Sequence, residues 1–279
     1  ISGNGIWKST DGARSWEPLP STLSPAIQSN NDFAYSWRVV VPLTADRTII
    51  LVASALRGIL RSVDGGATWT RVLQSNSYFS DLVRASDSTL YATLSSFDGS
   101  SNGVAIRSGV FMSSDHGATW TDVTPPDLQK PFSRIVLGVS QQYPSQVFAV
   151  AQTPGKGTKS LFILRDGTRE EWHSLWKRSN GTWQNLSQNI PLFGGRNGDF
   201  FSQGGYDLFI QVSPEDTTYV LLGGTNLYRS TDGFTSTSNT SWVGGYGAPS
   251  PNELFPSRLN HHPDQRDAIF LPSNTNIFY

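Results

Sequence analysis

Cysteine is absent from this 279-residue sequence, so neither disulfide bonds nor thiolate metal ligands are available to the fold. Charge is scarce as well: 15% of the residues are charged, and the formal net charge is -1 at pH 7. A nearly neutral chain offers no electrostatic footprint for nucleic acid or for an anionic membrane surface. No apolar run approaches the roughly 18 residues that a spanning helix needs. We therefore expect neither a nucleic-acid partner nor a membrane span.

Glycine and aromatic residues are plentiful, with 26 Gly, 9 Trp, 9 Tyr and 15 Phe. This composition is typical of turn-rich β architecture, and no long stretch shows helical periodicity. The chain is long enough to bury a sizeable core, as one large repeat domain or two smaller ones.

An octapeptide recurs along the chain, with full copies at 62–69 and 113–120 and a variant at 9–16. A shortened copy lies at 179–183, and the opening of another lies at 230–234. The copies begin roughly 50 to 65 residues apart, the spacing of propeller blades. The recurring residues are Ser9, Asp11, Trp16, Ser62, Asp64, Gly66, Trp69, Ser113, Asp115, Gly117, Trp120, Ser179, Trp183, Ser230 and Asp232.

The octapeptide predicts a self-contained hairpin. Asp-Gly between two strand-like runs supplies the positive φ of a tight turn, and the Asp and Ser side chains can accept hydrogen bonds from their own turn. Tryptophan at the start of the returning strand is a large apolar anchor. We expect the hairpins to lie at the outer rim on one face, with Trp16, Trp69, Trp120 and Trp183 buried between blades. Truncation of Trp69 to alanine should then cost about 3–5 kcal/mol.

Two apolar runs precede each copy after the first, at 39–43 and 48–53, 81–85 and 89–94, 134–139 and 146–150, and 208–212 and 218–222. With the hairpin they make four strands, so we predict an all-β fold: a propeller of four-stranded antiparallel blades, about five of them present. The predicted units of this single domain are 1–27, 28–75, 76–125, 126–190, 200–245 and a partial 258–279.

The two end units are each half a blade. Residues 1–16 supply an outer hairpin, and residues 267–279 supply two inner strands. These halves could close a ring of five. We instead expect the chain to be part of a larger propeller, with no pairing between 276–279 and 5–9.

The octapeptide resembles the Asp-box (BNR-type) hairpin of sialidases, sortilin-like propellers and xyloglucan-cleaving glycoside hydrolases. The resemblance implies that the box aspartates hold turns on the face away from the ligand site. From Phe200 onward, the segments 201–207, 223–233 and 261–265 resemble large secreted propellers of Bacteroidota. This similarity implies a secreted or cell-surface bacterial protein, export by the type IX route, and possible partners in the secretion machinery or on the surface.

Catalysis needs groups outside the boxes. The Arg-Ile-Pro sequence that typically precedes the first box of sialidases is missing, which argues against that activity. A glycoside hydrolase needs two carboxylates, about 5–5.5 Å apart for retention or about 6.5–9.5 Å apart for inversion. The candidates are Asp199, Asp207, Glu253 and Asp264, in loops rich in glycine and aromatic residues. The alternative is that Asp207 caps a turn and Asp264 holds its loop. A raised pKa and a carboxylate partner would favour the hydrolase.

Candidate ligand contacts are Gln203, Tyr206, His261 and His262. The histidines could join Asp264 around a cation, but Arg266 stands where the secreted relatives usually carry histidine, so we expect no metal and no cofactor. Two insertions, 97–108 and 153–172, should form loops on one face, often the binding face.

We therefore expect a secreted binding or scaffold module for protein or glycan ligands. An extracellular polysaccharide hydrolase of the xyloglucanase-like type is the alternative.

Overall fold

The computed structural model describes residues 3–23, 32–44, 48–96, 100–101, 104–105, 107–128, 131–164, 167–194, 197–246, 258–259, 263–271 and 274–279. Within these ranges the protein contains β-strands and two short 3-10 turns, Pro20–Thr22 and Ser187–Asn189, and no α-helix. Contacts divide the chain into two compact units. The N-terminal unit comprises residues 1–84 and 88–124, and the C-terminal unit comprises residues 85–87 and 125–279.

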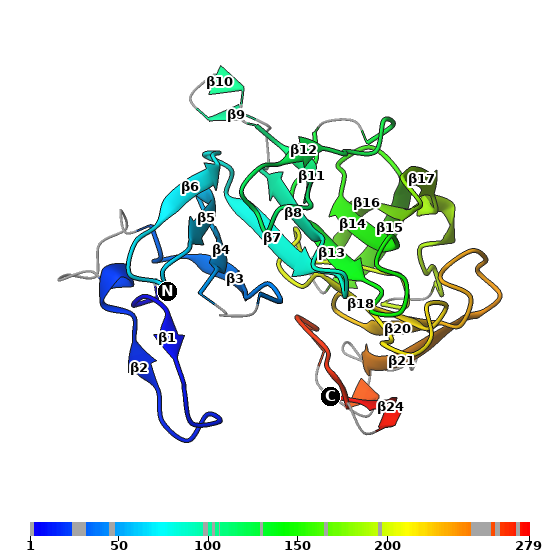
Figure 1. Ribbon diagram of the computed structural model, residues 1–279. Helices are drawn as coiled ribbons and strands as arrows, with labels where there is room; N and C mark the ends of the chain where they lie inside the picture. Colours follow the sequence, from blue (N-terminus) through cyan, green and yellow to red (C-terminus); the bar gives the residue numbers. More distant parts are fainter. Residues whose placement is uncertain are drawn as a thin grey trace. The chain divides into compact units, whose positions relative to one another are not determined.

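The N-terminal unit holds two four-stranded antiparallel sheets, each a simple meander (Figure 1). The first runs in the order β3 (Ser36–Val40), β4 (Ile50–Ser54), β5 (Gly58–Ser62) and β6 (Thr70–Leu73). The second comprises β7 (Phe79–Arg84), β8 (Leu90–Ser95), β11 (Gly109–Ser113) and β12 (Thr121–Asp122). Two small hairpins pair β1 (Trp7–Lys8) with β2 (Glu17–Pro18) and β9 (Ser100–Ser101) with β10 (Val104–Ala105).

The C-terminal unit holds two five-stranded sheets and a terminal hairpin. The first sheet contains β13 (Ile135–Val139), β14 (Val147–Gln152), β15 (Thr158–Leu164), β16 (Gly167–Ser179) and β17 (Thr182–Asn185). The second runs through β18 (Phe209–Val212), β19 (Val220–Gly223), β20 (Leu227–Ser230), β21 (Thr240–Tyr246) and β22 (Arg258–Leu259). The terminal hairpin pairs β23 (Phe270–Leu271) with β24 (Asn274–Phe278).

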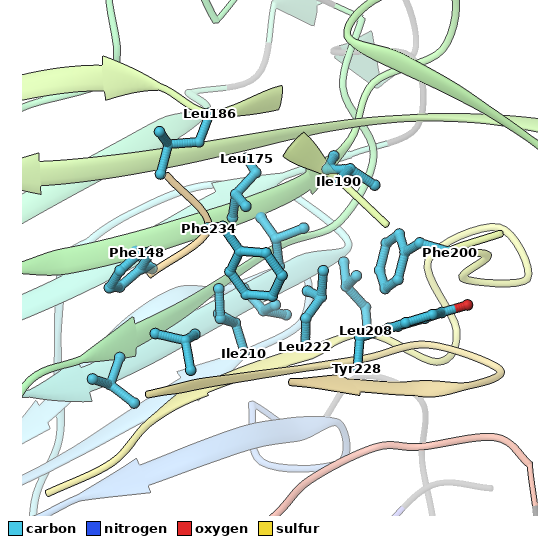
Figure 2. Close-up of a cluster of buried hydrophobic side chains, with 14 residues drawn as sticks. Phe148, Leu175, Leu186, Ile190, Phe200, Leu208, Ile210, Leu222, Tyr228 and Phe234 are labelled. Atoms are coloured by element: carbon cyan, nitrogen blue, oxygen red, sulfur yellow. The ribbon is translucent and has the colours of Figure 1, made fainter. Parts of the chain in front are cut away.

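The inner strands of each unit are buried on both faces, which explains their nearly continuous apolar sequences. All residues of β4 and β8 are buried. In the C-terminal unit, fourteen buried side chains fill the space between the two large sheets, and Figure 2 shows Phe234 lying between Leu175 and Leu222 in this cluster. The sheets approach so closely that a Cβ on Gly138 would lie 2.7 Å from the carbonyl oxygen of Ile210.

The octapeptide turns have the predicted internal hydrogen bonds. In the copy at 62–69, the Ser62 hydroxyl accepts from the backbone N–H of Gly66 at 2.8 Å and donates to Asp64 at 2.7 Å. Asp64 in turn accepts from the backbone N–H of Thr68 at 2.9 Å and from its hydroxyl at 2.6 Å. The copies at 9–16 and 113–120 repeat this pattern.

These hydrogen bonds favour the ionised aspartates. Bonds from the Thr119 hydroxyl and N–H lower the pKa of Asp115 to about 2, against the opposing effect of burial. At Asp232, burial raises the pKa, but hydrogen bonds from Ser236, Asn239 and Ser230 outweigh it and hold the value at about 2.

The predicted burial of the box tryptophans is wrong for Trp16, whose side chain is 55% exposed in the β1–β2 hairpin. Trp69, Trp120 and Trp183 are half-buried. Trp69 packs edge-on against Phe33 at 4.9 Å and donates its indole N–H to Ser21 at 3.0 Å. A tryptophan at this position therefore anchors its turn only where a neighbouring segment covers it.

The insertion at 153–172 is also not the predicted loop. It forms β15 and the first half of β16, which pair over seven residues from Thr158 opposite His173 to Leu164 opposite Gly167. The thirteen-residue β16 thereby pairs with β15 over its first half and with β14 and β17 over its second half. The insertion at 97–108 contains the β9–β10 hairpin and otherwise lies partly outside the described residues.

Each predicted pair of inner runs is a pair of adjacent antiparallel strands: β3–β4, β7–β8, β13–β14 and β18–β19. The position of the hairpins at a common rim, and the absence of pairing between β24 and β1, concern different units and stay predictions.

Candidate functional site

A cleft of about 500 Å³ opens in the C-terminal unit. The β15–β16 hairpin supplies one wall, the ends of β14 and β21 contribute one residue each, and the segment between Phe200 and β18 supplies the rest. Its lining residues are Gln152, Phe162, Arg169, Glu170, Glu171, Phe201, Gln203, Gly204 and Tyr246. The cleft thus combines aromatic rings with charged and amide side chains.

Three aromatic rings form the apolar part of the cleft. Phe162 stacks on Phe201 with ring centroids 4.8 Å apart and planes 25° apart. Tyr246 meets Phe162 edge-on at 5.6 Å. Both phenylalanines are 5% exposed, whereas Tyr246 is half-buried, so the tyrosine presents the larger ring surface to solvent.

The 202–207 loop carries the polar side of the cleft, and Glu171 holds its base. The Glu171 carboxylate accepts from the backbone N–H of Ser202 at 2.7 Å, from the Ser202 hydroxyl at 3.0 Å and from the backbone N–H of Gly204. Burial alone would raise the pKa of Glu171. Hydrogen bonding and charge from His173, together with the N–H donors of the loop, outweigh burial and hold the pKa below its usual value.

His173 completes this network from the same strand, β16. Its ring is fully buried; Nε2 lies 2.9 Å from the Ser202 hydroxyl and 3.3 Å from Glu171. Serine, histidine and carboxylate here resemble a catalytic triad in composition only. In a triad the carboxylate orients the ring nitrogen that faces away from the serine. Here Glu171 and Ser202 both contact Nε2 of His173, so the network holds the 202–207 loop in place.

Asp207 ends that loop and lies fully buried at the start of the β18 sheet. Within the described part of the chain, neither of its carboxylate oxygens has a hydrogen-bond partner. Burial and the adjacent negative charge of Asp264 together raise the pKa of Asp207 to about 7, against the opposing effect of Arg266. The turn-capping alternative for this side chain is therefore wrong.

Asp264 reaches the same place from the C-terminal segment. Its Oδ1 accepts from the amide of Gln203 at 2.7 Å, and its backbone N–H donates to Thr225 at 3.1 Å. The Arg266 guanidinium lies over the Tyr206 ring at 4.1 Å, and its Nε is 3.5 Å from Asp207. The structure thus brings together Gln203, Tyr206, Asp207 and Asp264, four of the predicted candidates.

The other candidates lie elsewhere or outside the described residues. Asp199 accepts hydrogen bonds from the backbone N–H groups of Gly194 at 2.8 Å and Leu161 at 3.2 Å. It therefore closes the loop at 194–199 and joins that loop to strand β15. Glu253, His261 and His262 fall outside the described residues.

The sequence did not single out Glu171, His173, Phe162 or Tyr246. Glu171 lies in the charged part of the insertion at 153–172, and this location is the only feature of the sequence that points to a functional role for it. Pairing β14 and β16 places Gln152 opposite His173, which brings the insertion alongside the 202–207 loop.

The arrangement of acids limits the chemistry. Asp264 lies beside Asp207, and its negative charge contributes to the raised pKa of Asp207. Neither carboxylate lines the cleft. Glu171 already accepts three hydrogen bonds.

No protein-family model matches the sequence. A xyloglucanase of Paenibacillus sp is 29% identical over 195 residues, which cover 63% of this chain and 19% of that protein. A xyloglucanase of Acetivibrio thermocellus is 26% identical over 63% of this chain and 23% of its own length. The chain thus spans about a fifth of the length of the xyloglucanases it matches. Among the described residues, no helix is long and apolar enough to cross a membrane.

Two solved structures share the fold. A GH74 enzyme of Niastella koreensis aligns with a TM-score of 0.56 and 20% identity, covering 86% of this chain and 35% of the enzyme. The α-L-arabinofuranosidase Arb93A of Fusarium graminearum aligns with a TM-score of 0.50 and 12% identity, covering 98% of this chain and 79% of the enzyme. The predicted fold class, a propeller of antiparallel four-stranded blades, is confirmed.

Proposed function

We propose that this protein is a propeller module that binds a polysaccharide in the cleft of the C-terminal unit. The observation that carries the proposal is the composition of the cleft: stacked aromatic rings beside Arg169, Glu170 and Gln203. Sugar rings have apolar C–H faces and hydroxyl-bearing edges, so they are bound by aromatic platforms flanked by hydrogen-bonding side chains. The volume of about 500 Å³ lies within the range of small-ligand sites.

Xyloglucan is the first ligand to test, because the relatives with significant sequence similarity are named xyloglucanases. Because a polysaccharide does not cross a membrane unaided, we infer that the protein acts outside the cell or on its surface. The similarity of residues 200–279 to secreted propellers supports the same location. We assign the Asp-box aspartates a structural role, since their carboxylates bind within their own turns.

The binding experiment compares the protein with three variants by isothermal titration against xyloglucan oligosaccharides. Tyr246→Ala and Gln203→Ala remove cleft side chains, and Tyr143→Ala removes a tyrosine of the same unit that is 55% exposed outside the cleft. Loss of one ring platform should weaken binding about tenfold, equivalent to about 1.4 kcal/mol. Tyr143→Ala should bind like the unmodified protein. Absence of binding to every polysaccharide offered, or equal weakening by Tyr143→Ala, would contradict the proposal.

Hydrolysis of the bound polysaccharide is the second candidate function. A carboxyl with a pKa of about 7, as at Asp207, is protonated at neutral pH in the way a general acid requires. Its complete burial and the close approach of Asp264 argue against this role. Release of reducing ends from xyloglucan, lost in Asp207→Asn, would favour the hydrolase over the binding module.

A further inference from the structure

We propose that the N-terminal unit carries a second glycan site, an aromatic hollow at the start of β3 that takes a neutral oligosaccharide chain. The hollow has a volume of about 390 Å³ and is lined by Gly3, Gly5 and residues 33–37. The position of the site follows from the N-terminal unit alone. The choice of a glycan as its ligand rests on the proposed function, and variants of each site distinguish the two claims.

Three large aromatic side chains are exposed at this place. Tyr35 and Trp37 line the hollow, and each is 38% exposed. Tyr78 is 46% exposed. The Trp37 and Tyr78 rings both lie against Phe79, with ring centroids at 5.6 Å and 5.0 Å from it. Single exposed aromatic residues need no explanation, but several gathered in one place mark a binding surface.

Trp37 is held in its exposed position. The pairing of β3 with β4 shifts register between Ser36 and Arg38, so Trp37 is the extra residue of a β-bulge. A bulge re-aims a side chain, and bulges are frequent beside active sites. The indole N–H of Trp37 donates to the backbone oxygen of Tyr78 at 3.1 Å, which fixes the ring before a ligand arrives. A ring ordered in advance loses little conformational entropy on binding.

The lining of the hollow determines the class of ligand. None of the described residues that line it is charged, so it offers no partner to an acidic or basic group. The charged residues on either side of the segment pair elsewhere, Asp32 with two arginines and Arg38 with Asp81. The Ser36 hydroxyl donates to the Phe33 carbonyl at 3.1 Å and keeps acceptor capacity for a sugar hydroxyl. Aromatic faces beside a neutral polar group suit an uncharged sugar ring.

The hollow occupies the same position of the repeat as the cleft of the C-terminal unit. Residues 33–37 lead into β3, the first strand of its sheet, and residues 200–207 lead into β18, the first strand of its own. Aromatic residues of this connection line both cavities, Phe201 in the cleft and Tyr35 and Trp37 in the hollow. In repeat folds, connections at one position of the repeat often form the binding surface. The recurrence supports a ligand of the same class in both cavities.

Isothermal titration of the full chain with xyloglucan oligosaccharides counts the sites, and we expect two per chain. The Tyr246→Ala background, in which the cleft is weakened, isolates the hollow. Adding Trp37→Ala or Tyr35→Ala should weaken the remaining binding about tenfold, equivalent to about 1.4 kcal/mol. Trp37→Phe keeps a ring at the bulge and should retain binding, which guards against a variant that fails to fold. Trp16→Ala is the matched control, because Trp16 is an exposed tryptophan of the same unit that does not line the hollow.

The pattern of losses separates the two sites. A single site that Tyr246→Ala weakens and Trp37→Ala leaves unchanged would overturn the second site and keep the cleft. A single site with the opposite response would support the hollow and contradict the cleft, and no binding to any polysaccharide would overturn both. Equal weakening by Trp16→Ala would overturn the second site. Sedimentation tests a second copy of the chain as the occupant: if Trp37→Ala abolishes self-association and leaves glycan binding unchanged, the proposal is wrong.

Discussion

Replacing Asp207 with asparagine should stabilise the protein at alkaline pH. Asparagine keeps the shape of the side chain and removes the buried charge that Asp264 opposes. The pKa of Asp207 is about 7 in the folded protein, against 3.8 for an aspartate in the unfolded chain. The folded state therefore binds a proton that the unfolded state has already released between these values, and stability falls as pH rises through this window.

The magnitude follows from that difference. Each unit of difference in pKa corresponds to 1.36 kcal/mol of the free energy of unfolding. The difference between 3.8 and about 7 therefore lowers this free energy by about 4 kcal/mol, and the loss is complete once the pH exceeds about 7. The asparagine of Asp207→Asn does not ionise, so the variant does not lose this stability as the pH rises. It should match the unmodified protein at pH 4 and exceed its free energy of unfolding by up to about 4 kcal/mol at pH 8.

Urea unfolding at intervals from pH 4 to pH 8 measures the effect. Asp216→Asn serves as the control, because hydrogen bonds from Thr218 lower the pKa of Asp216 and its charge is favourable in the fold. Parallel pH profiles for Asp207→Asn and the unmodified protein, or a less stable Asp207→Asn at pH 8, would refute the assignment of Asp207 as a destabilising buried carboxyl.

Three further predictions concern the repeats. Trp69→Ala should lower the free energy of unfolding by about 2–3 kcal/mol, because the half-buried Trp69 ring packs on a phenylalanine. Trp16→Ala should change it little, because the Trp16 side chain is 55% exposed; chemical denaturation of both variants compares the two effects. Gly117→Ala should cost more than Gly65→Ala: both have positive φ, but the added Cβ at 117 would lie 2.3 Å from a buried leucine and that at 65 meets nothing within 4 Å. Asp115→Asn should lose less stability than the unmodified protein between pH 4 and pH 2 in an acid titration, because the depressed pKa of Asp115 makes its contribution present above 3.8 and lost as pH falls through about 2.

The parts of the fold that the sequence predicted depend on local chemistry. The turn at 62–69 closes on hydrogen bonds between its own Ser62, Asp64 and Thr68, so no distant residue is needed to specify it. Inner strands such as β4 are buried on both faces and read as continuous apolar runs. Both the turn and the buried strands can be predicted from a stretch of sequence shorter than one repeat.

The parts that it missed depend on neighbours. Trp16 and Trp69 occupy the same position of the octapeptide, yet only Trp69 has a ring packed on it. Glu171 has no motif around it, and its role arises because β14 and β16 pair and bring it to the backbone of the 202–207 loop. The buried, unpartnered state of Asp207 likewise depends on a segment about sixty residues later in the chain.

Hydrogen exchange measured with and without xyloglucan oligosaccharides tests the central claim most directly, because it reports where a ligand binds. We expect protection in β15, in the 202–207 loop and at the end of β21, which together line the cleft. Strands β4, β5 and β6 of the N-terminal unit should exchange at unchanged rates. Protection confined to the N-terminal unit, or none at saturating ligand, would contradict the assignment of this cleft as the polysaccharide site.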